Sequence, residues 1–373
     1  MPSIRVLIVD DSVVVRKVVS EAISSDPAIQ VAGTAADGKI ALAKIPLLNP
    51  DIITLDVEMP GINGIETLKE IRRLYPKLPV IMFSTMTERG AAITLDALSL
   101  GASDYVTKPS KSGDPDVAAE RVRTEMVPKI KALCAQRPIE PPSALLAAPA
   151  TDVAVPQLII PAVPRQASSR IDILAIGAST GGPNALAKML PLFPANFPIP
   201  IVIVQHMPPL FTRLLSDRLN DQTKITIREG VPGSILEPGH VWIAPGDFHM
   251  AVERFGANVR LAMNQRSHEN SCRPSVDVLF RSVAKVYGSN VLALVLTGMG
   301  ADGVRGSQHI REQGGLVYVQ DEASSVVWGM PGLVAQAGLA DDIIPLDIMA
   351  YEIVRRVKNS RSLPGRKVAG IAQ

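Results

Sequence analysis

Near its start, the sequence reads Ile4-Arg5-Val6-Leu7-Ile8-Val9-Asp10-Asp11-Ser12, an apolar and largely β-branched run that ends in two carboxylates and a serine. Such a run predicts a buried strand. Four more short runs of this kind follow within the first 109 residues, with helical patterns between them, at Gln30–Thr34, Ile52–Leu55, Val80–Phe83 and Tyr105–Thr107. Strands that alternate with helices predict right-handed crossovers and a parallel sheet. The first part of the chain is therefore expected to be an α/β domain.

Polar side chains stand at the carboxyl ends of these predicted strands: Asp10, Asp11, Asp56, Ser84 and Lys108. In an open parallel sheet these ends converge on one crevice. Three crowded carboxylates repel one another unless a divalent cation lies between them, and Mg2+ accepts carboxylate oxygens together with water. With such a cation, Asp56 could act as a nucleophile toward a phosphoryl group, Lys108 could pair with its oxygens and Ser84 could donate to another. The pattern predicts a phosphoryl-accepting site.

A second α/β pattern follows a proline-rich stretch. Residues 115–136 predict a last amphipathic helix of the first domain, and residues 137–170 contain seven prolines and hardly any periodic pattern. Proline-rich segments do not build a packed core but do hold a spacing, so we expect a linker here. Beyond it, strand patterns occur at Ile171–Ile176, Ile199–Val204, Val241–Ile243, Val291–Leu296 and Gly315–Val319. The sequence predicts two α/β domains and leaves their strand order open.

Composition excludes several classes of protein. The 38 Lys and Arg residues against 36 Asp and Glu leave a net charge of +2, and only 14 residues are aromatic, which argues against binding of nucleic acid or of an anionic membrane. The 2 cysteines are too few for a disulfide framework or a zinc ribbon. Neither a signal peptide nor an apolar run of about 18 residues is visible, so we expect a cytoplasmic protein without a membrane span.

A glycine-rich turn in the second domain carries a serine: Gly177-Ala178-Ser179-Thr180-Gly181-Gly182, after a predicted strand and before a helix that begins near Pro183. It matches G-x-S-x-G, a turn that presents a serine hydroxyl above a sheet, with a helix N-terminus that favours developing negative charge. The same glycines could instead cradle a phosphate, or form a plain tight turn. The motif alone leaves these three interpretations open.

A nucleophilic serine needs a base and a carboxylate. Of the five histidines, His206 follows a predicted strand, and His249 is its rival, in a predicted loop after Trp242–Ala244. For the other three, a surface or packing role is expected: His240, His268 and His309. No HExxH spacing occurs, which disfavours a catalytic zinc. For the carboxylate that orients the imidazole, the candidates are Asp302, Asp247 and Asp277, and spacing does not separate them.

The first domain resembles a known family. The motifs Val9-Asp10-Asp11-Ser12, Leu55-Asp56-Val57-Glu58-Met59-Pro60-Gly61 and Thr107-Lys108-Pro109 are similar to those of two-component receiver domains. The resemblance implies a flavodoxin-like fold with Asp56 as the phospho-acceptor. It further implies a Mg2+ site and a switch: the metal ligands would be Asp11, Asp56 and the Glu58 carbonyl with Asp10 behind them, and the switch residues Ser84, Tyr105 and Lys108.

The second domain resembles the catalytic domain of the chemotaxis protein-glutamate methylesterases, the CheB family. The resemblance rests on Ile176–Gly182 and on Gln205-His206-Met207, Ala244-Pro245-Gly246-Asp247, Arg273-Pro274-Ser275-Val276-Asp277 and Leu296–Gly303. It implies a doubly wound, mostly parallel α/β fold, a triad of Ser179, His206 and Asp302, an oxyanion hole that uses the Met299 backbone N–H, and Thr180 as a support for His206. It implies no cofactor in the catalytic site. Cys272 departs from the family, in which histidine is common at this position.

The resemblance implies a function and a domain plan. The expected reactions are hydrolysis of glutamyl methyl esters on chemoreceptors, with release of methanol, and deamidation of specific glutamines, for sensory adaptation in chemotaxis. A histidine kinase would be the phosphodonor, and the unphosphorylated receiver would cover the catalytic face of a monomer. The expected boundaries are 1–136 for the receiver, 137–169 for the linker, 170–360 for the catalytic domain and 361–373 for a tail.

Three other functions compete with this one. The second domain could hydrolyse small acyl esters, bind a nucleotide, or serve as the effector of a DNA-binding response regulator. A nucleotide site would call for an acidic residue about 20 positions past the glycine turn. That stretch instead reads Pro191-Leu192-Phe193-Pro194-Ala195-Asn196-Phe197-Pro198. The near-neutral charge disfavours DNA binding.

Overall fold

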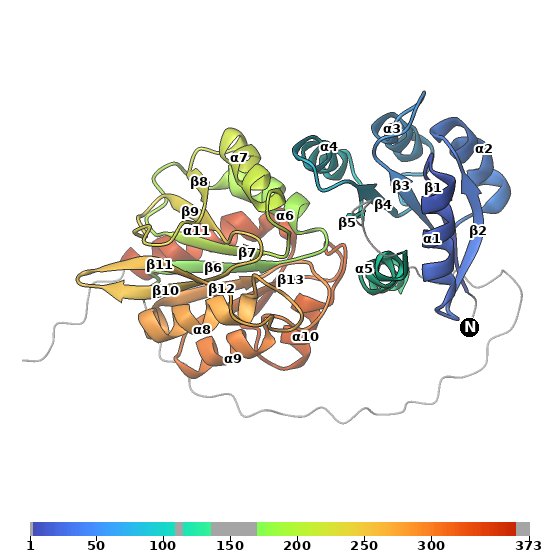
Figure 1. Cartoon of the computed structure of the whole chain (residues 1–373). Coiled ribbons are helices and arrows are strands. Elements are labelled where there is room, and N and C mark those ends of the chain that lie inside the picture. The colour runs from blue at the N-terminus through green and yellow to red at the C-terminus, as the bar shows by residue number, and fades with distance from the viewer. Residues whose placement is uncertain (1–2, 109–114, 136–169, 363–373) are drawn as a thin grey trace, which may run out of the picture.

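The computed structural model describes residues 3–108, 115–135 and 170–362. The expected linker, 137–169, and most of the expected tail lie outside the described residues. The described chain forms two α/β parts, drawn in blue to teal and in green to red in Figure 1. Among the described residues, no helix combines the length and the apolar character needed to cross a membrane.

The first part is a five-stranded parallel sheet in the order β2-β1-β3-β4-β5. Its strands lie where the sequence predicts them: β1 Ile4–Val9, β2 Ile29–Ala35, β3 Ile52–Asp56, β4 Val80–Ser84 and β5 Asp104–Thr107. The helices lie between the strands and after the last of them: α1 Val13–Ser24, α2 Gly38–Leu48, α3 Gly64–Leu74, α4 Glu88–Ser99 and α5 Pro115–Ala135. The first four helices each begin after a polar residue whose side chain accepts a backbone N–H, namely Ser12, Asp37, Asn63 and Thr87. This is the expected receiver-like fold.

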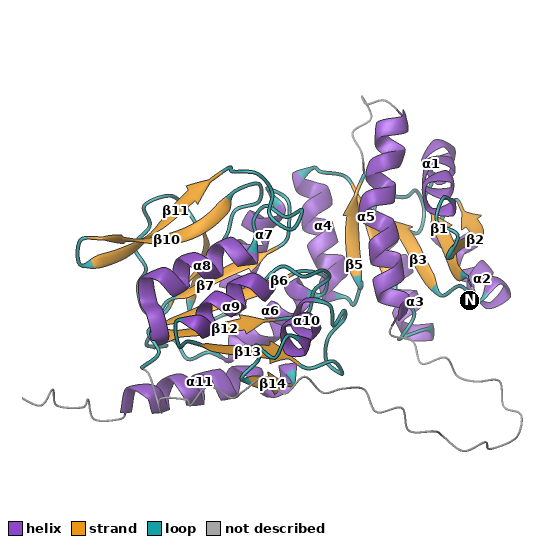
Figure 2. Ribbon diagram, turned by 90° about the horizontal axis from the view of Figure 1, so that it is seen from below, coloured by secondary structure: helices purple, strands orange, loops and turns teal. Residues whose placement is uncertain are grey.

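The second part holds a seven-stranded parallel sheet in the order β14-β13-β12-β6-β7-β9-β8. Five of its strands match the predicted ones: β6 Ile173–Ala178, β7 Ile201–Gln205, β9 His240–Ile243, β12 Val291–Val295 and β13 Leu316–Gln320. Its helices are α6 Gly182–Met189, α7 Phe211–Gln222, α8 Val276–Tyr287, α9 Val304–Glu312, α10 Met330–Gln336 and α11 Leu346–Ser362, with short 3-10 turns η1 Leu190–Leu192 and η2 Gly288–Asn290. Helices cover both faces of this sheet (Figure 2).

Four strands are not predicted by the sequence: β8 Thr226–Glu229, β14 Asp342–Ile344 and the antiparallel hairpin of β10 His249–Phe255 with β11 Asn258–Asn264. The first two are short edge strands with polar residues, which give little apolar signal. The expectation of a loop at His249 is wrong, because this residue starts β10 and is buried. The hairpin projects from the second part (Figure 1).

The glycine turn after β6 can be formed only by glycine at two positions. Gly181 has a φ of 78°, in the left-handed region that L side chains avoid. A Cβ at Gly182 would lie 2.0 Å from Oε1 of Gln205. The turn carries Ser179 directly after the carboxyl end of β6 and leads into α6, which begins at Gly182.

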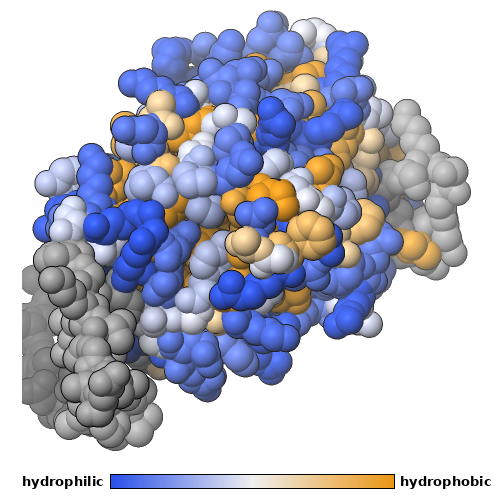
Figure 3. Space-filling model, turned by 90° about the vertical axis from the view of Figure 1, so that its left-hand side faces the viewer, coloured by the Kyte–Doolittle hydropathy of each residue, from blue (hydrophilic) through white to orange (hydrophobic). Residues whose placement is uncertain are grey.

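The two parts pack against each other through α4, β5 and α5 of the first. Helix α4 contacts α6 and α7 (Figure 2). The ring of Tyr105 stacks on that of Phe211, with centroids 4.8 Å apart and planes 7° from parallel. By contrast, the face of the catalytic part that looks away from the first sheet is mainly hydrophilic, with small interrupted apolar areas (Figure 3).

The core of the catalytic part can be tested with two phenylalanines. Phe280 on α8 is fully buried, whereas Phe255 on β10 is 53% exposed. Phe280→Ala should lower the free energy of unfolding by about 3–5 kcal/mol, because it leaves a cavity. Phe255→Ala should cost about 1 kcal/mol or less, since it loses little beyond the Arg260 guanidinium above its ring. Urea unfolding followed by circular dichroism measures both, and equal losses would contradict this assignment of the core.

Candidate active site and phosphorylation site

The carboxylates at the strand ends of the first sheet surround a lysine. Asp10 and Asp56 are buried, and Nζ of Lys108 lies 2.8 Å from Asp10 Oδ2 and 2.7 Å from Asp56 Oδ2. Burial raises the pKa of Asp56 to about 6, although the charge and hydrogen bond of Lys108 act in the opposite direction. Lys108 therefore neutralises only part of the negative charge of these carboxylates.

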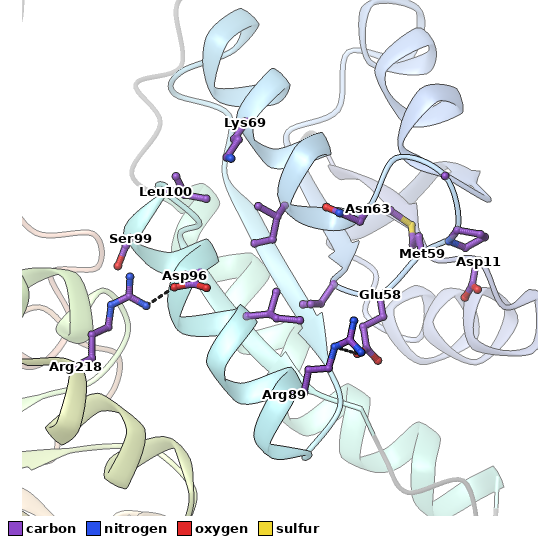
Figure 4. Close-up of a pocket in the computed structure, with 15 residues that line it drawn as sticks. Asp11, Glu58, Met59, Asn63, Lys69, Arg89, Asp96, Ser99, Leu100 and Arg218 are labelled. Carbon is purple, nitrogen blue, oxygen red and sulfur yellow. Dashed lines mark hydrogen bonds and ion pairs between the residues drawn. The ribbon is translucent and has the colours of Figure 1, made fainter.

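The same residues fit a hard divalent cation. Oxygen atoms of Asp10, Asp11 and Asp56 lie within 4.8 Å of one another. The Glu58 N–H donates to Asp56 Oδ1 at 3.2 Å, so the Glu58 backbone lies beside the acceptor carboxylate. Carboxylate and carbonyl oxygens are the donors that Mg2+ prefers. Figure 4 shows that Asp11 and Glu58 line a groove that continues along α4 to Arg218 on α7.

The expected switch residues lie between this site and the catalytic part. Ser84 is buried, and its hydroxyl donates to the Gly90 carbonyl at 3.1 Å. Tyr105 is buried against Phe211. Burial raises the pKa of Tyr105 well above its usual value, and the charges of Asp104 and Glu125 add to this effect, so the phenol stays protonated.

Ser179 stands directly after β6, at the centre of the larger sheet. Its N–H donates to the Thr297 carbonyl at 3.1 Å, and its own carbonyl accepts from Nε2 of Gln205 at 2.9 Å. The backbone around the hydroxyl is therefore held on both sides. Among the described residues, Ser179 Oγ has no hydrogen-bond partner. The candidate nucleophile is thus held in place by its backbone, while its hydroxyl is not bonded to a base.

His206 and Asp302 are brought together by the ends of β7 and β12. Nε2 of His206 lies 2.8 Å from Oδ2 of Asp302. The Asp302 carboxylate is buried and accepts four further hydrogen bonds, from Asn270 Nδ2, Ser275 Oγ, Val276 N and Asp277 N. Burial raises the pKa of Asp302, but the hydrogen bonds outweigh it and hold this pKa at about 2. Asp302 is thus a fixed, ionised anchor for the imidazole.

The competing residues have other partners. Asp247 pairs with Arg273, and Asp277 accepts from the N–H groups of Gly303 and Gly306. Nε2 of His249 faces the Ser267 carbonyl at 3.0 Å. Of the three carboxylates left open by the sequence, the geometry places Asp302 against His206.

The other imidazole nitrogen of His206 faces Cys272, a contact that the sequence did not predict. Nδ1 of His206 lies 3.6 Å from Sγ of Cys272. Burial acts to lower the pKa of His206, but contact with Asp302 and Cys272 raises it above its usual value. The only sequence signal for this contact was that Cys272 departs from the residue common in the resembling family.

Among the described residues, Thr180 forms no hydrogen bond with His206, in contrast to the expectation from the resemblance. Its hydroxyl donates to Oδ2 of Asp104 at 2.7 Å, and both residues are buried. Lys129 Nζ lies 3.0 Å from the same oxygen. Asp104 was missed because the strand was expected to begin one residue later, at Tyr105. The residue after the nucleophile is therefore bonded to the receiver-like part.

Met299 lies where an oxyanion hole is expected, in the loop after β12. Among the described residues, its N–H has no hydrogen-bond partner. A Cβ on the preceding Gly298 would lie 2.8 Å from Cβ of Ser179, so this loop passes close to the nucleophile. The Met299 side chain packs against the apolar cluster that includes α5 of the receiver-like part.

Comparisons with known proteins agree with the two halves of the structure. Residues 6–117 match the response regulator receiver domain, and residues 174–353 match the CheB methylesterase family. A protein-glutamate methylesterase/protein-glutamine glutaminase of Trichodesmium erythraeum is 53% identical over 96% of this chain and 100% of its own. One of a Nocardioides species is 50% identical over 97% of each chain.

The chain belongs to the protein-glutamate methylesterase/protein-glutamine glutaminase family. The relatives match along nearly the whole chain, so the chain shares both domains and their order with this family. The expected fold class, a receiver followed by an α/β catalytic domain, is confirmed.

The contact between His206 and Asp302 predicts how His206 titrates. Because a carboxylate favours the charged imidazole, His206 should lose its proton at a pH above 6.5, the usual value. Asp302→Asn should lower this pKa, whereas Asp247→Asn, which alters a carboxylate paired with Arg273, should leave it in place. NMR of the imidazole resonances measures the midpoint. An unchanged midpoint in Asp302→Asn would contradict the geometry.

Proposed function

We propose that this protein hydrolyses glutamyl methyl esters on chemoreceptors, releasing methanol, and deamidates specific receptor glutamines by the same acyl chemistry. The observation that carries the proposal is the gathering of Ser179, His206 and Asp302 at the carboxyl ends of the parallel strands. The Met299 N–H, which has no hydrogen-bond partner in the described part of the chain, lies in the loop beside them. The printed names of the relatives support this substrate class. The expected location is the cytoplasm, where the receptor helices that carry these esters lie.

The geometry supports a different role for each imidazole nitrogen. Since Nε2 is occupied by Asp302, Nδ1 would accept the proton of Ser179 Oγ in this mechanism. Nδ1 now faces Cys272, so the imidazole has to leave this contact before it can act as a base. Asp302 stabilises the imidazolium that then forms.

The reaction proceeds through an acyl-enzyme. Ser179 Oγ attacks the side-chain carbonyl, and the Met299 N–H stabilises the oxyanion, an effect of about 3 kcal/mol per donor in comparable enzymes. The N-terminus of α6, directly behind Ser179, favours the same negative charge. His206 protonates the leaving methanol or ammonia, and water then attacks the acyl-enzyme with His206 as base.

The serine mechanism predicts which substitutions abolish turnover. Ser179→Ala and His206→Ala should each lower methanol release from methylated receptors by about 1,000-fold or more, because triad members act as a unit. His249→Ala should have a much smaller effect, since its ring faces a carbonyl away from His206. Phosphorylation should persist in all three variants. Substantial turnover by Ser179→Ala would contradict the mechanism.

The receiver site is proposed to take a phosphoryl group from a histidine kinase. Asp56 would be the acceptor, and Asp11, Asp56 and the Glu58 carbonyl would hold Mg2+, with Asp10 beside them. Mg2+ would neutralise charge on the incoming phosphoryl oxygens. Lys108 is already within reach of the acceptor carboxylate and would pair with one of these oxygens.

Phosphorylation is proposed to uncover the catalytic face. Ser84 would turn from the Gly90 carbonyl toward the phosphoryl group, and Tyr105 would repack into the space that it leaves. Such repacking would break the stack on Phe211 and disturb the neighbouring Asp104–Thr180 hydrogen bond. The effect of phosphorylation at Asp56 would then reach Thr180, the residue next to Ser179.

The exposed ion pairs across the interface contribute less to its stability than the buried contacts do. Arg213 with Glu88 and Arg218 with Asp96 join the two parts at the surface, where Figure 4 shows the second pair. Exposed pairs of this kind contribute about 0.2–1 kcal/mol each. A modest shift at the buried contacts can therefore release the interface.

This account predicts how the receiver controls activity. A fragment that begins at residue 166 should release methanol faster than the unphosphorylated full-length protein, because its active site is not covered. Asp56→Asn should abolish activation by a phosphodonor and keep the basal rate. If the fragment is no faster than the resting full-length enzyme on a receptor substrate, the receiver does not shield the site, and recruitment to the kinase becomes the better explanation.

A further inference from the structure

His206 Nδ1 and Cys272 Sγ form a pair of metal-ligating atoms that the proposed hydrolysis does not use as a pair. They lie 3.6 Å apart. In a tetrahedral zinc site, a Zn–S bond of about 2.3 Å and a Zn–N bond of about 2.0–2.1 Å place sulfur and nitrogen about 3.6 Å from each other. The two side chains are therefore spaced as two ligands of one Zn2+ ion.

The other side of the imidazole has the support that metal-bound histidines usually have. Nε2 lies 2.8 Å from Asp302 Oδ2, the carboxylate–histidine arrangement that fixes a ligand's ring and raises its basicity. The Asp302 oxygens already accept four further hydrogen bonds, so this carboxylate stays outside the ligand set. It holds His206 with Nδ1 directed at Cys272.

The pair is open to an ion from solution. Both residues line one pocket between the two parts of the protein, and His268 lines it as well. The cations that line this pocket are each paired with a carboxylate: Arg121 with Glu125, Lys129 with Asp104, and Arg273 with Asp247. Positive charge is thus compensated, and water from the pocket can complete the coordination.

We propose that His206 Nδ1 and Cys272 Sγ bind a thiophilic divalent cation, Zn2+ above all, and that the bound ion inhibits the enzyme. The thiol gives up its proton on binding, and thiolate with imidazole selects Zn2+ over Mg2+. The inhibitory part rests on the proposed function, because Nδ1 is the atom that must accept the Ser179 proton. The bound ion and the Ser179 proton then compete for the same atom, Nδ1 of His206.

Direct binding is tested with Co2+ as a spectroscopic probe for the zinc site. The full-length protein is titrated with Co2+ in saturating Mg2+, which fills the acidic receiver site, and thiolate-to-Co2+ charge-transfer absorption is recorded. Wild type should give this band. Cys134→Ser, which removes the other cysteine of the sequence, should keep it, and Cys272→Ser should lose it. Cys272→His should recover Zn2+ binding by calorimetry, without the thiolate band. An equal band in Cys272→Ser would overturn the site.

Inhibition is tested by methanol release, compared with and without Zn2+ within each variant. Wild type and Cys134→Ser should be inhibited and should recover with a chelator. Cys272→Ser should require at least about tenfold more Zn2+, since losing a ligand costs no less than losing its outer partner. Binding without inhibition would overturn the inhibitory role. Absence of methanol release by metal-free wild type would contradict the proposed function, while the Co2+ spectrum would still test the site.

Discussion

The buried hydrogen bond from the Thr180 hydroxyl to Asp104 is the contact on which the relation between the two halves depends. Thr180 follows the proposed nucleophile Ser179, and Asp104 precedes the proposed switch residue Tyr105. Both groups are removed from water, so the Thr180 hydroxyl cannot lose this bond cheaply without a new partner. The position of the receiver and the surroundings of Ser179 are therefore linked by this buried polar contact, and the stacked rings of Tyr105 and Phe211 join the same two parts.

The same geometry accounts for a catalytic site that is assembled but at rest. Asp302 holds His206 firmly, yet Nδ1 faces Cys272, and Ser179 Oγ has no partner among the described residues. Met299, which would donate to the oxyanion, packs under the receiver cluster. In the proposed mechanism, activation would need small changes at His206, Ser179 and Met299 and would leave the sheet that carries them intact.

Much of the fold could be predicted because parallel strands leave strong local patterns. The strands that end at or just before Asp56, Ser179 and His206 are visible in the sequence as β-branched runs. The edge strands β8 and β14 are too short and too polar to give such a pattern. The position of polar residues at strand ends also predicted that Asp10, Asp56 and Lys108 lie together, as they do. The partners of Thr180 and Cys272 could not be predicted, since they depend on the packing of loops and domains far apart in the sequence.

The central claim is that phosphorylation at Asp56 releases contacts beside Ser179. Amide hydrogen exchange on the full-length protein, with and without a small-molecule phosphodonor, tests it most directly. The account predicts that phosphorylation lowers protection together in two segments, Asp104–Thr107 and the turn 178–182, while the catalytic core strand β12 keeps its protection. Loss of protection confined to the receiver, with the turn around Ser179 unchanged, would contradict it.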